Sequence, residues 1–129
     1  MFPTRRLFQA VKQTTSIYGV AVHPSPRPHL ISVYQQTLEA LKPIPATAVY
    51  RQATEALTKQ RLGVVEGTEN VEEIERTLDV GQIEEVIMQA EDELKLISKM
   101  IQWKAWEPLE EPAPKGQWDF FSQPSVNKV

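Results

Sequence analysis

The sequence predicts an all-α fold: a three-helix bundle with one short extra helix, an extended N-terminal arm and an irregular C-terminal tail rich in proline and tryptophan. Apolar residues recur at helical spacing through residues 29–104, and no segment shows the alternation that is typical of a strand. Prolines gather on both sides of this region, where they interrupt regular structure. The 129 residues fit one domain, with a basic, Pro-rich arm over 1–28, a helical bundle over 29–104 and an aromatic docking tail over 105–129.

The first two helices are separated by prolines. The first is expected over about 29–42, because Pro43 ends it. The second is expected to begin at Pro45, which suits a first helical position, and to run to Leu62 with Gly63 as its stop. Their expected core faces are Ile31, Tyr34, Leu38 and Leu41 in the first helix, and Val49, Ala53 and Leu57 in the second.

A short helix and a long helix complete the bundle. Asn70 opens the short helix, with Glu73 three residues later in a capping-box pattern. Gly81 interrupts the helical pattern there, or caps the join to the last helix over 82–104, which would be about 34 Å long at 1.5 Å per residue. Its long apolar stripe consists of Ile83, Val86, Ile87, Ala90, Leu94, Ile97 and Ile101.

Charge is distributed unevenly along the chain. The 14 basic and 17 acidic residues give a net charge of −3, which argues against nucleic acid as a partner because such binding needs a cationic face. The first 30 residues nevertheless hold four basic residues and no acid. This start resembles a mitochondrial targeting segment, and the alternative is a frayed basic terminus.

Several classes of site are excluded by residue type. The chain has no cysteine, so disulfides, thiolate catalysis and cysteine-held metal clusters are ruled out. No run of apolar residues is long enough for a membrane-spanning helix. The two histidines, His23 and His29, flank a proline-rich loop and are not expected to bind a metal.

The acidic clusters at 72–75 and 91–93 could suggest metal binding or paired-carboxylate catalysis. A di-iron bundle needs Glu-x-x-His motifs, and no histidine follows His29. A carboxylate-based hydrolase would need a pocket that raises the pKa of one acid. The acids of the last helix, Glu84 and Glu85 included, fall mostly off its apolar stripe. We therefore expect the acidic residues to be solvated or to contact a partner, and we expect no catalytic, cofactor-binding or metal site.

Aromatic residues are concentrated near the C-terminus. Half of the ten aromatic residues lie between 103 and 121, interleaved with proline and charge. Such a tail either folds back onto its own bundle or lies across a partner, where tryptophan contributes strongly to binding. Both alternatives can hold for different residues. The candidate docking residues are Trp103, Trp106, Pro108, Leu109, Trp118, Phe120 and Phe121.

The last helix and the segment after it resemble a known family. The chain reads GQIEEVIMQAE over residues 81–91, continues to Leu94, and reads WEPL over residues 106–109. This combination is similar to that of the B13-type alpha-subcomplex accessory subunits of mitochondrial NADH:ubiquinone oxidoreductase, complex I. The resemblance covers roughly residues 14–118. Shorter matches lie at Thr14-Thr15, Gly19, Ala21-Val22, Ile44-Pro45, Tyr50-Arg51, Thr54-Glu55 and Gln117-Trp118.

The resemblance implies a helical protein on the peripheral arm of complex I, on the matrix side of the mitochondrial inner membrane. Its partners would be core and accessory subunits of that arm, which it would assemble or stabilise. This arm carries electrons from NADH towards ubiquinone. The resemblance also implies no cofactor, no metal, no small-molecule substrate and no catalytic residue. The alternative is a free-standing helical adaptor or a complex I assembly factor, for which the residues would look the same.

Overall fold

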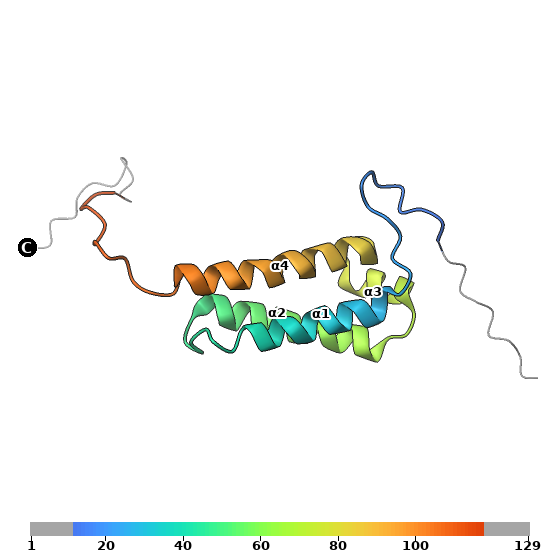
Figure 1. Cartoon of the computed structure of the whole chain (residues 1–129), viewed down its shortest axis with the longest axis horizontal. Coiled ribbons are helices and arrows are strands. Elements are labelled where there is room, and N and C mark those ends of the chain that lie inside the picture. The colour runs from blue at the N-terminus through green and yellow to red at the C-terminus, as the bar shows by residue number, and fades with distance from the viewer. Residues whose placement is uncertain (1–11, 118–129) are drawn as a thin grey trace, which may run out of the picture.

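All regular secondary structure in the described part of the chain is helical. The computed structural model describes residues 12–117 and contains, within that range, four helices and no strand (Figure 1). The helices are α1 (Pro26–Ala40), α2 (Val49–Gly67), α3 (Val71–Leu78) and α4 (Ile83–Trp103). The prediction of three long helices and one short helix is therefore confirmed. The N-terminal arm and the C-terminal tail leave the bundle at opposite ends (Figure 1).

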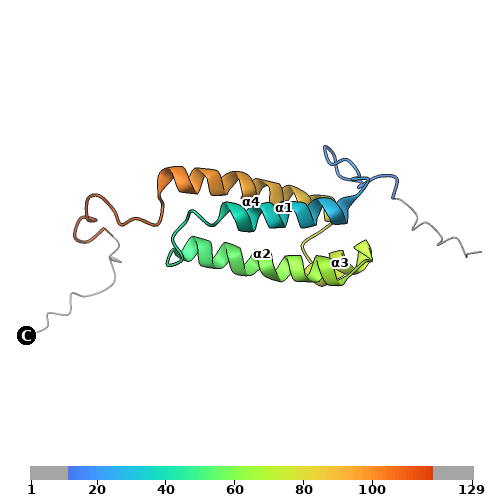
Figure 2. The same ribbon diagram turned by 60° about the horizontal axis from the view of Figure 1, so that its bottom comes forward.

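The three long helices do not all contact each other. α1 packs most extensively against α4 and also packs against α2, whereas α2 and α4 barely touch. Figure 2 shows this arrangement, with α1 lying between α4 and α2. α3 contacts both α2 and α4 at one end of the bundle. The bundle is therefore open along the side between α2 and α4.

The start of α1 lies inside the proline run. Prolines occupy its first and third positions, Pro26 and Pro28, and cost no hydrogen bond there because the first N–H groups of a helix have no partner within it. The prediction that these prolines exclude helix, with a start near residue 29, is wrong for this reason. Between them, the Arg27 Nε donates to the carbonyl oxygen of Val65 at 2.9 Å. This bond ties the start of α1 to the end of α2.

The boundaries of α2 also differ from the predicted ones. Pro45 is not its first residue but lies in the preceding turn, where its carbonyl oxygen accepts a hydrogen bond from the Ala48 N–H at 3.0 Å. Gly63 is not its stop, because the helix continues to Gly67. A glycine inside a helix costs only about 1 kcal/mol. Contacts of the last turn act against that cost, among them the hydrogen bonds from Arg27 to the carbonyl oxygens of Val65, Glu66 and Thr68.

The face of α2 that packs inward is not the one its apolar residues predict. Its buried residues are Thr54, Thr58 and Val65. By contrast, Val49 and Leu57 are 78% and 49% exposed, so the predicted core face through these residues is wrong. The reason is tertiary: α2 is covered by α1 but hardly by α4, so only a narrow strip of its surface is buried.

The core has two parts. The larger cluster joins α1 and α4 to the end of α2 and to α3, and the smaller one lies at the opposite end, around the turn between α1 and α2. The α4 stripe is confirmed, since five of its seven residues are buried and the other two partly buried. In α1 the buried face is rotated from the predicted one, with Leu30 and Val33 buried and Ile31 and Leu38 half-buried. The buried apolar residues are Leu30, Val33, Tyr34, Val65, Ile74, Ile83, Val86, Ile87 and Ala90 in the first cluster and Leu41, Ile44, Ala48 and Ile97 in the second.

Local hydrogen bonds set the junction of α3 and α4. The predicted cap at Asn70 is confirmed, because its Oδ1 accepts from the Glu72 N–H at 3.0 Å. Gly81 then takes a left-handed conformation with φ of +110°, which a residue with a side chain adopts only under strain. The next residue donates its N–H to the Glu85 Oε2 at 2.8 Å, a bond that caps the first turn of α4.

Candidate docking surface

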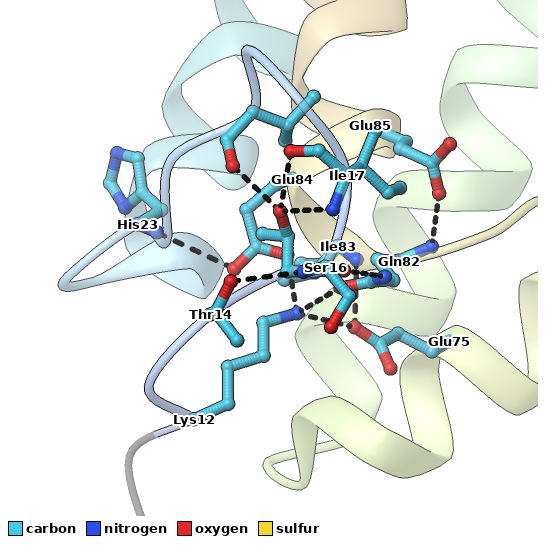
Figure 3. A network of polar contacts seen from close by, with 12 residues as sticks. Lys12, Thr14, Ser16, Ile17, His23, Glu75, Gln82, Ile83, Glu84 and Glu85 are labelled. Atoms are coloured by element: carbon cyan, nitrogen blue, oxygen red, sulfur yellow. Dashed lines mark hydrogen bonds and ion pairs between the residues drawn. The ribbon is translucent and has the colours of Figure 1, made fainter.

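A network of polar side chains fastens the N-terminal arm to the start of α4 (Figure 3). Lys12 Nζ donates to the Glu84 Oε2 at 2.6 Å and to the Gln82 Oε1 at 2.9 Å, and it lies 3.7 Å from the Glu75 Oε1. Glu84 is only 5% exposed, so water screens this ion pair weakly. The network therefore holds a distant part of the chain firmly on the bundle.

The backbone of the arm completes this network. Gln82 Nε2 donates to the Thr15 carbonyl oxygen at 2.7 Å, and the His23 N–H donates to the Glu84 Oε1 at 3.4 Å. The buried Thr15 hydroxyl donates to the Val20 carbonyl oxygen at 2.6 Å and so closes a turn within the arm. The motif that carries the family resemblance thus has a structural role: two of its residues receive the arm.

The charge state of Glu84 follows from these contacts. Burial raises the pKa of Glu84, but the hydrogen bonds from Lys12 and from backbone N–H groups, with the Lys12 charge, outweigh burial and lower the pKa overall. Glu84 is therefore ionised at neutral pH, which suits an ion pair rather than a general acid. Glu84 lies off the predicted apolar stripe and is nevertheless buried, because the arm, far away in sequence, covers it.

Other acids of the predicted clusters also join elements. The Tyr50 hydroxyl donates to Glu93, and both burial and this carboxylate raise the pKa of Tyr50. The Glu91 Oε1 lies 2.8 Å from the Nε2 of His29, which belongs to α1 rather than to a loop. The rings of His23 and His29 stack with centroids 4.8 Å apart. Within residues 12–117, no group of three or more His, Asp or Glu side chains is placed to hold a metal ion.

The described C-terminal candidates differ in their exposure. Trp106 is half-buried and packs on the smaller core cluster, near Ile97. Trp103 and Leu109 are 63% and 76% exposed, and Pro108 is exposed as well. The remaining candidates, Trp118, Phe120 and Phe121, lie outside the described residues.

Exposed apolar residues gather at the end of the bundle from which the tail leaves. Val49 begins α2 beside the same core cluster that receives Trp106, and Trp103 ends α4 there. We call Val49 and Trp103, together with Leu109 of the tail that leaves the bundle there, the apolar end. Sequence reasoning missed Val49 because it assigned this residue to the core, and only the absence of a covering helix reveals its exposure.

The described helices include none that is both long and apolar enough to cross a membrane. The described residues thus define a small helical bundle with an anchored N-terminal arm and exposed apolar residues at one end.

Comparison with known proteins identifies the family. Residues 19–85 match the ETC complex I subunit conserved region. NADH dehydrogenase (ubiquinone) 1 alpha subcomplex subunit 5 of Bos taurus is 47% identical over 108 residues, covering 84% of this chain and 93% of the relative. The probable subunit 5 of Caenorhabditis elegans is 48% identical, covering 84% of this chain and 73% of the relative. The probable mitochondrial subunit 5 of Arabidopsis thaliana is 47% identical, covering 79% of this chain and 60% of the relative. The chain belongs to this family of complex I subunits.

Proposed function

We propose that the protein is a non-catalytic accessory subunit of mitochondrial complex I, bound peripherally on the matrix side of the inner membrane. It assembles or stabilises the peripheral arm that carries electrons from NADH towards ubiquinone. Its partners are core and accessory subunits of that arm, and it binds no cofactor or small-molecule substrate. The observation that carries the proposal is the identity of about half of the aligned residues to alpha subcomplex subunits from animals and a plant.

The polar chemistry of the chain supports a structural role. The buried carboxylate, Glu84, is committed to an ion pair that joins the arm to α4. Glu91 and Glu93 likewise connect α4 to other elements. Each of these acids is used to hold the fold, which is what a scaffold subunit requires.

The apolar end and the tail supply the docking surface in this proposal. Exposed aromatic and aliphatic side chains lose hydration when they bind a partner, which contributes about 25 cal/mol per Å² of buried apolar surface. Trp103 and Leu109 act as anchors, whereas Trp106 acts mainly by holding the first part of the tail on the bundle. Trp118, Phe120 and Phe121, which lie outside the described residues, are further candidates for this contact.

Native gel separation of detergent-solubilised mitochondria tests the proposal. The chain is followed by mass spectrometry in cells whose own copy is replaced by a tagged one. We expect stoichiometric comigration with the band that oxidises NADH, and we expect the chain to be lost from that band in a Trp103→Ala, Leu109→Ala double variant. Met88→Ala is the control, because Met88 is a half-exposed apolar residue on another face of the bundle.

Two other results of the gel experiment would contradict parts of the proposal. Migration only as a small free species, or only with partial assemblies, would support a free-standing adaptor or an assembly factor instead. Comigration that survives the double variant unchanged would keep the chain in the complex but remove the apolar end as its docking surface.

A further inference from the structure

A groove runs along the open side of the bundle between α2 and α4. It has a volume of about 530 Å³ and is mostly apolar in lining. Its floor is the α1 surface at Tyr34 and Thr37, and its walls include Leu57 from α2 and Leu96 from α4. These two leucines are 49% and 38% exposed. The groove exists because α1 lies between the other two long helices, which hardly meet (Figure 2).

The charged side chains on the two sides of the groove differ in whether they have a partner of opposite charge or a hydrogen bond. On the α4 side, Asp92 pairs with Lys95 at 3.0 Å and Glu93 accepts a hydrogen bond from Tyr50. On the α2 side, Arg61 forms no ion pair with any carboxylate of residues 12–117.

The floor of the groove contains a second polar group that lacks a full set of hydrogen-bond partners, the hydroxyl of Tyr34. Tyr34 is 3% exposed, and its hydroxyl lies close to the Arg61 side chain, which acts as a donor towards it, but no described residue accepts the hydroxyl proton. Burial raises the pKa of Tyr34, and the charge of the nearby Arg61 acts against this effect. A buried hydroxyl and a half-buried cation without a counter-ion both favour a ligand that brings an acceptor to this point.

We propose that this groove, which we call the α2–α4 groove, binds an amphipathic helix of a neighbouring subunit that presents apolar side chains to Leu57 and Leu96 and a carboxylate to Arg61. The inference rests on the proposed function, since the occupant belongs to the same complex. Such a helix would fill the open side and complete a four-helix bundle.

Helical geometry suits the groove better than an extended segment does. The walls span residues 53–61 of α2 and 89–96 of α4, which at 1.5 Å per residue is a length of about 12 Å, or two helical turns. A helix satisfies its own backbone hydrogen bonds, whereas an extended segment would place unpaired N–H and carbonyl groups against apolar walls. A carboxylate on the helix would be drawn to Arg61, and the acids on the α4 side would repel a second one near them.

Site-specific photo-crosslinking in the intact complex tests this proposal. A benzophenone amino acid replaces Leu57, and in a matched control it replaces Met88, which is 48% exposed and lies outside the groove. Irradiation precedes isolation of the NADH-oxidising complex and identification of the linked peptides. We expect position 57 to label one helical segment of another subunit, with apolar residues at helical spacing and an Asp or Glu, and position 88 not to label it.

Charge reversal gives the second measurement. We expect Arg61→Glu to lower occupancy in the complex about tenfold, and the reciprocal acid-to-arginine change in the labelled segment to restore it. Gln60→Glu, at an exposed neighbouring position, is expected to stay within about twofold. If Arg61→Glu destabilises the isolated chain, the crosslink alone decides.

Other outcomes would overturn the inference. Crosslinks from position 57 to residues 118–129 of the same chain, to a second copy, to lipid alone, or to nothing would each assign the groove differently. If the wild-type chain comigrates with complex I in these cases, only the groove assignment fails. If the wild-type chain does not comigrate, the proposed function fails first.

Discussion

Replacing Ile97 by alanine tests how the small core cluster holds α4. Ile97 is fully buried against Leu41, Ile44 and Ala48, with Trp106 packed at the edge. Ile97→Ala removes three carbon atoms, which costs about 2.4 kcal/mol at about 0.8 kcal/mol per buried methylene. The cavity adds to this, but half-buried Trp106 can move to fill part of it, so we expect a total near 3 kcal/mol in a range of about 2–5.

Urea unfolding of the full chain, followed by far-UV circular dichroism, measures this cost. Met88→Ala is the matched control in the same helix, because Met88 is 48% exposed and its truncation should cost about 1 kcal/mol or less. A loss for Ile97→Ala within about 1 kcal/mol of the control loss would refute the reasoning. It would mean that the cluster around the α1–α2 turn is not a packed part of the core.

The other predictions concern the junction, the arm and the tail. Gly81→Ala should destabilise the chain by about 1–3 kcal/mol in a thermal melt, because φ is +110° and an added Cβ would collide with the carboxylate that caps α4; an unchanged melting temperature would contradict this. Glu84→Gln should cost about 1–3 kcal/mol near pH 6. The folded pKa of Glu84 lies below its ordinary value of 4.5, so the wild-type advantage is present above about pH 4.5 and is lost as pH falls through the folded pKa. Urea unfolding over a pH series downwards from about pH 6 measures this; an advantage that does not shrink at all below about pH 4.5 would count against the ion pair. Truncation directly after residue 107 should release the chain from its complex without unfolding it, whereas truncation after 105 also removes half-buried Trp106 and should lower the melting temperature; equal melts for both truncations would show that Trp106 does not support the bundle.

The spacing of apolar residues predicts the buried face correctly where a neighbouring helix covers that whole face. α4 is covered along one full face by α1, so its apolar residues and its buried residues largely coincide. α2 is different, because Leu57 lines the α2–α4 groove and Val49 is exposed at the start of the helix, whereas its buried residues include Thr54 and Thr58. A helical period shows that a helix is amphipathic, but it does not show which neighbours are present to cover it.

The site was predictable in part. The aromatic content of the tail predicts a docking segment, and docking itself stays a prediction. Among the described candidates, Trp103 at the end of α4 and Leu109 in the tail are exposed. The anchoring network was not predictable, because Lys12 and Glu84 are 72 residues apart and nothing in a single sequence pairs them. The α2–α4 groove was missed for the same reason, since it depends on two helices that both pack on a third.

The sequence by itself determined the fold class, the number of helices and the family, because helical periodicity, capping residues and the motif that resembles the family are all local. Only the tertiary structure decided which faces are buried, where the arm is held and which side of the bundle is open. The same contrast between local propensity and tertiary packing holds at single positions. Pro26 and Pro28 lie inside α1 and Gly63 lies inside α2, although each residue type on its own predicts a helix end. Local propensities amount to about 1 kcal/mol each, and the packing of whole helices outweighs them.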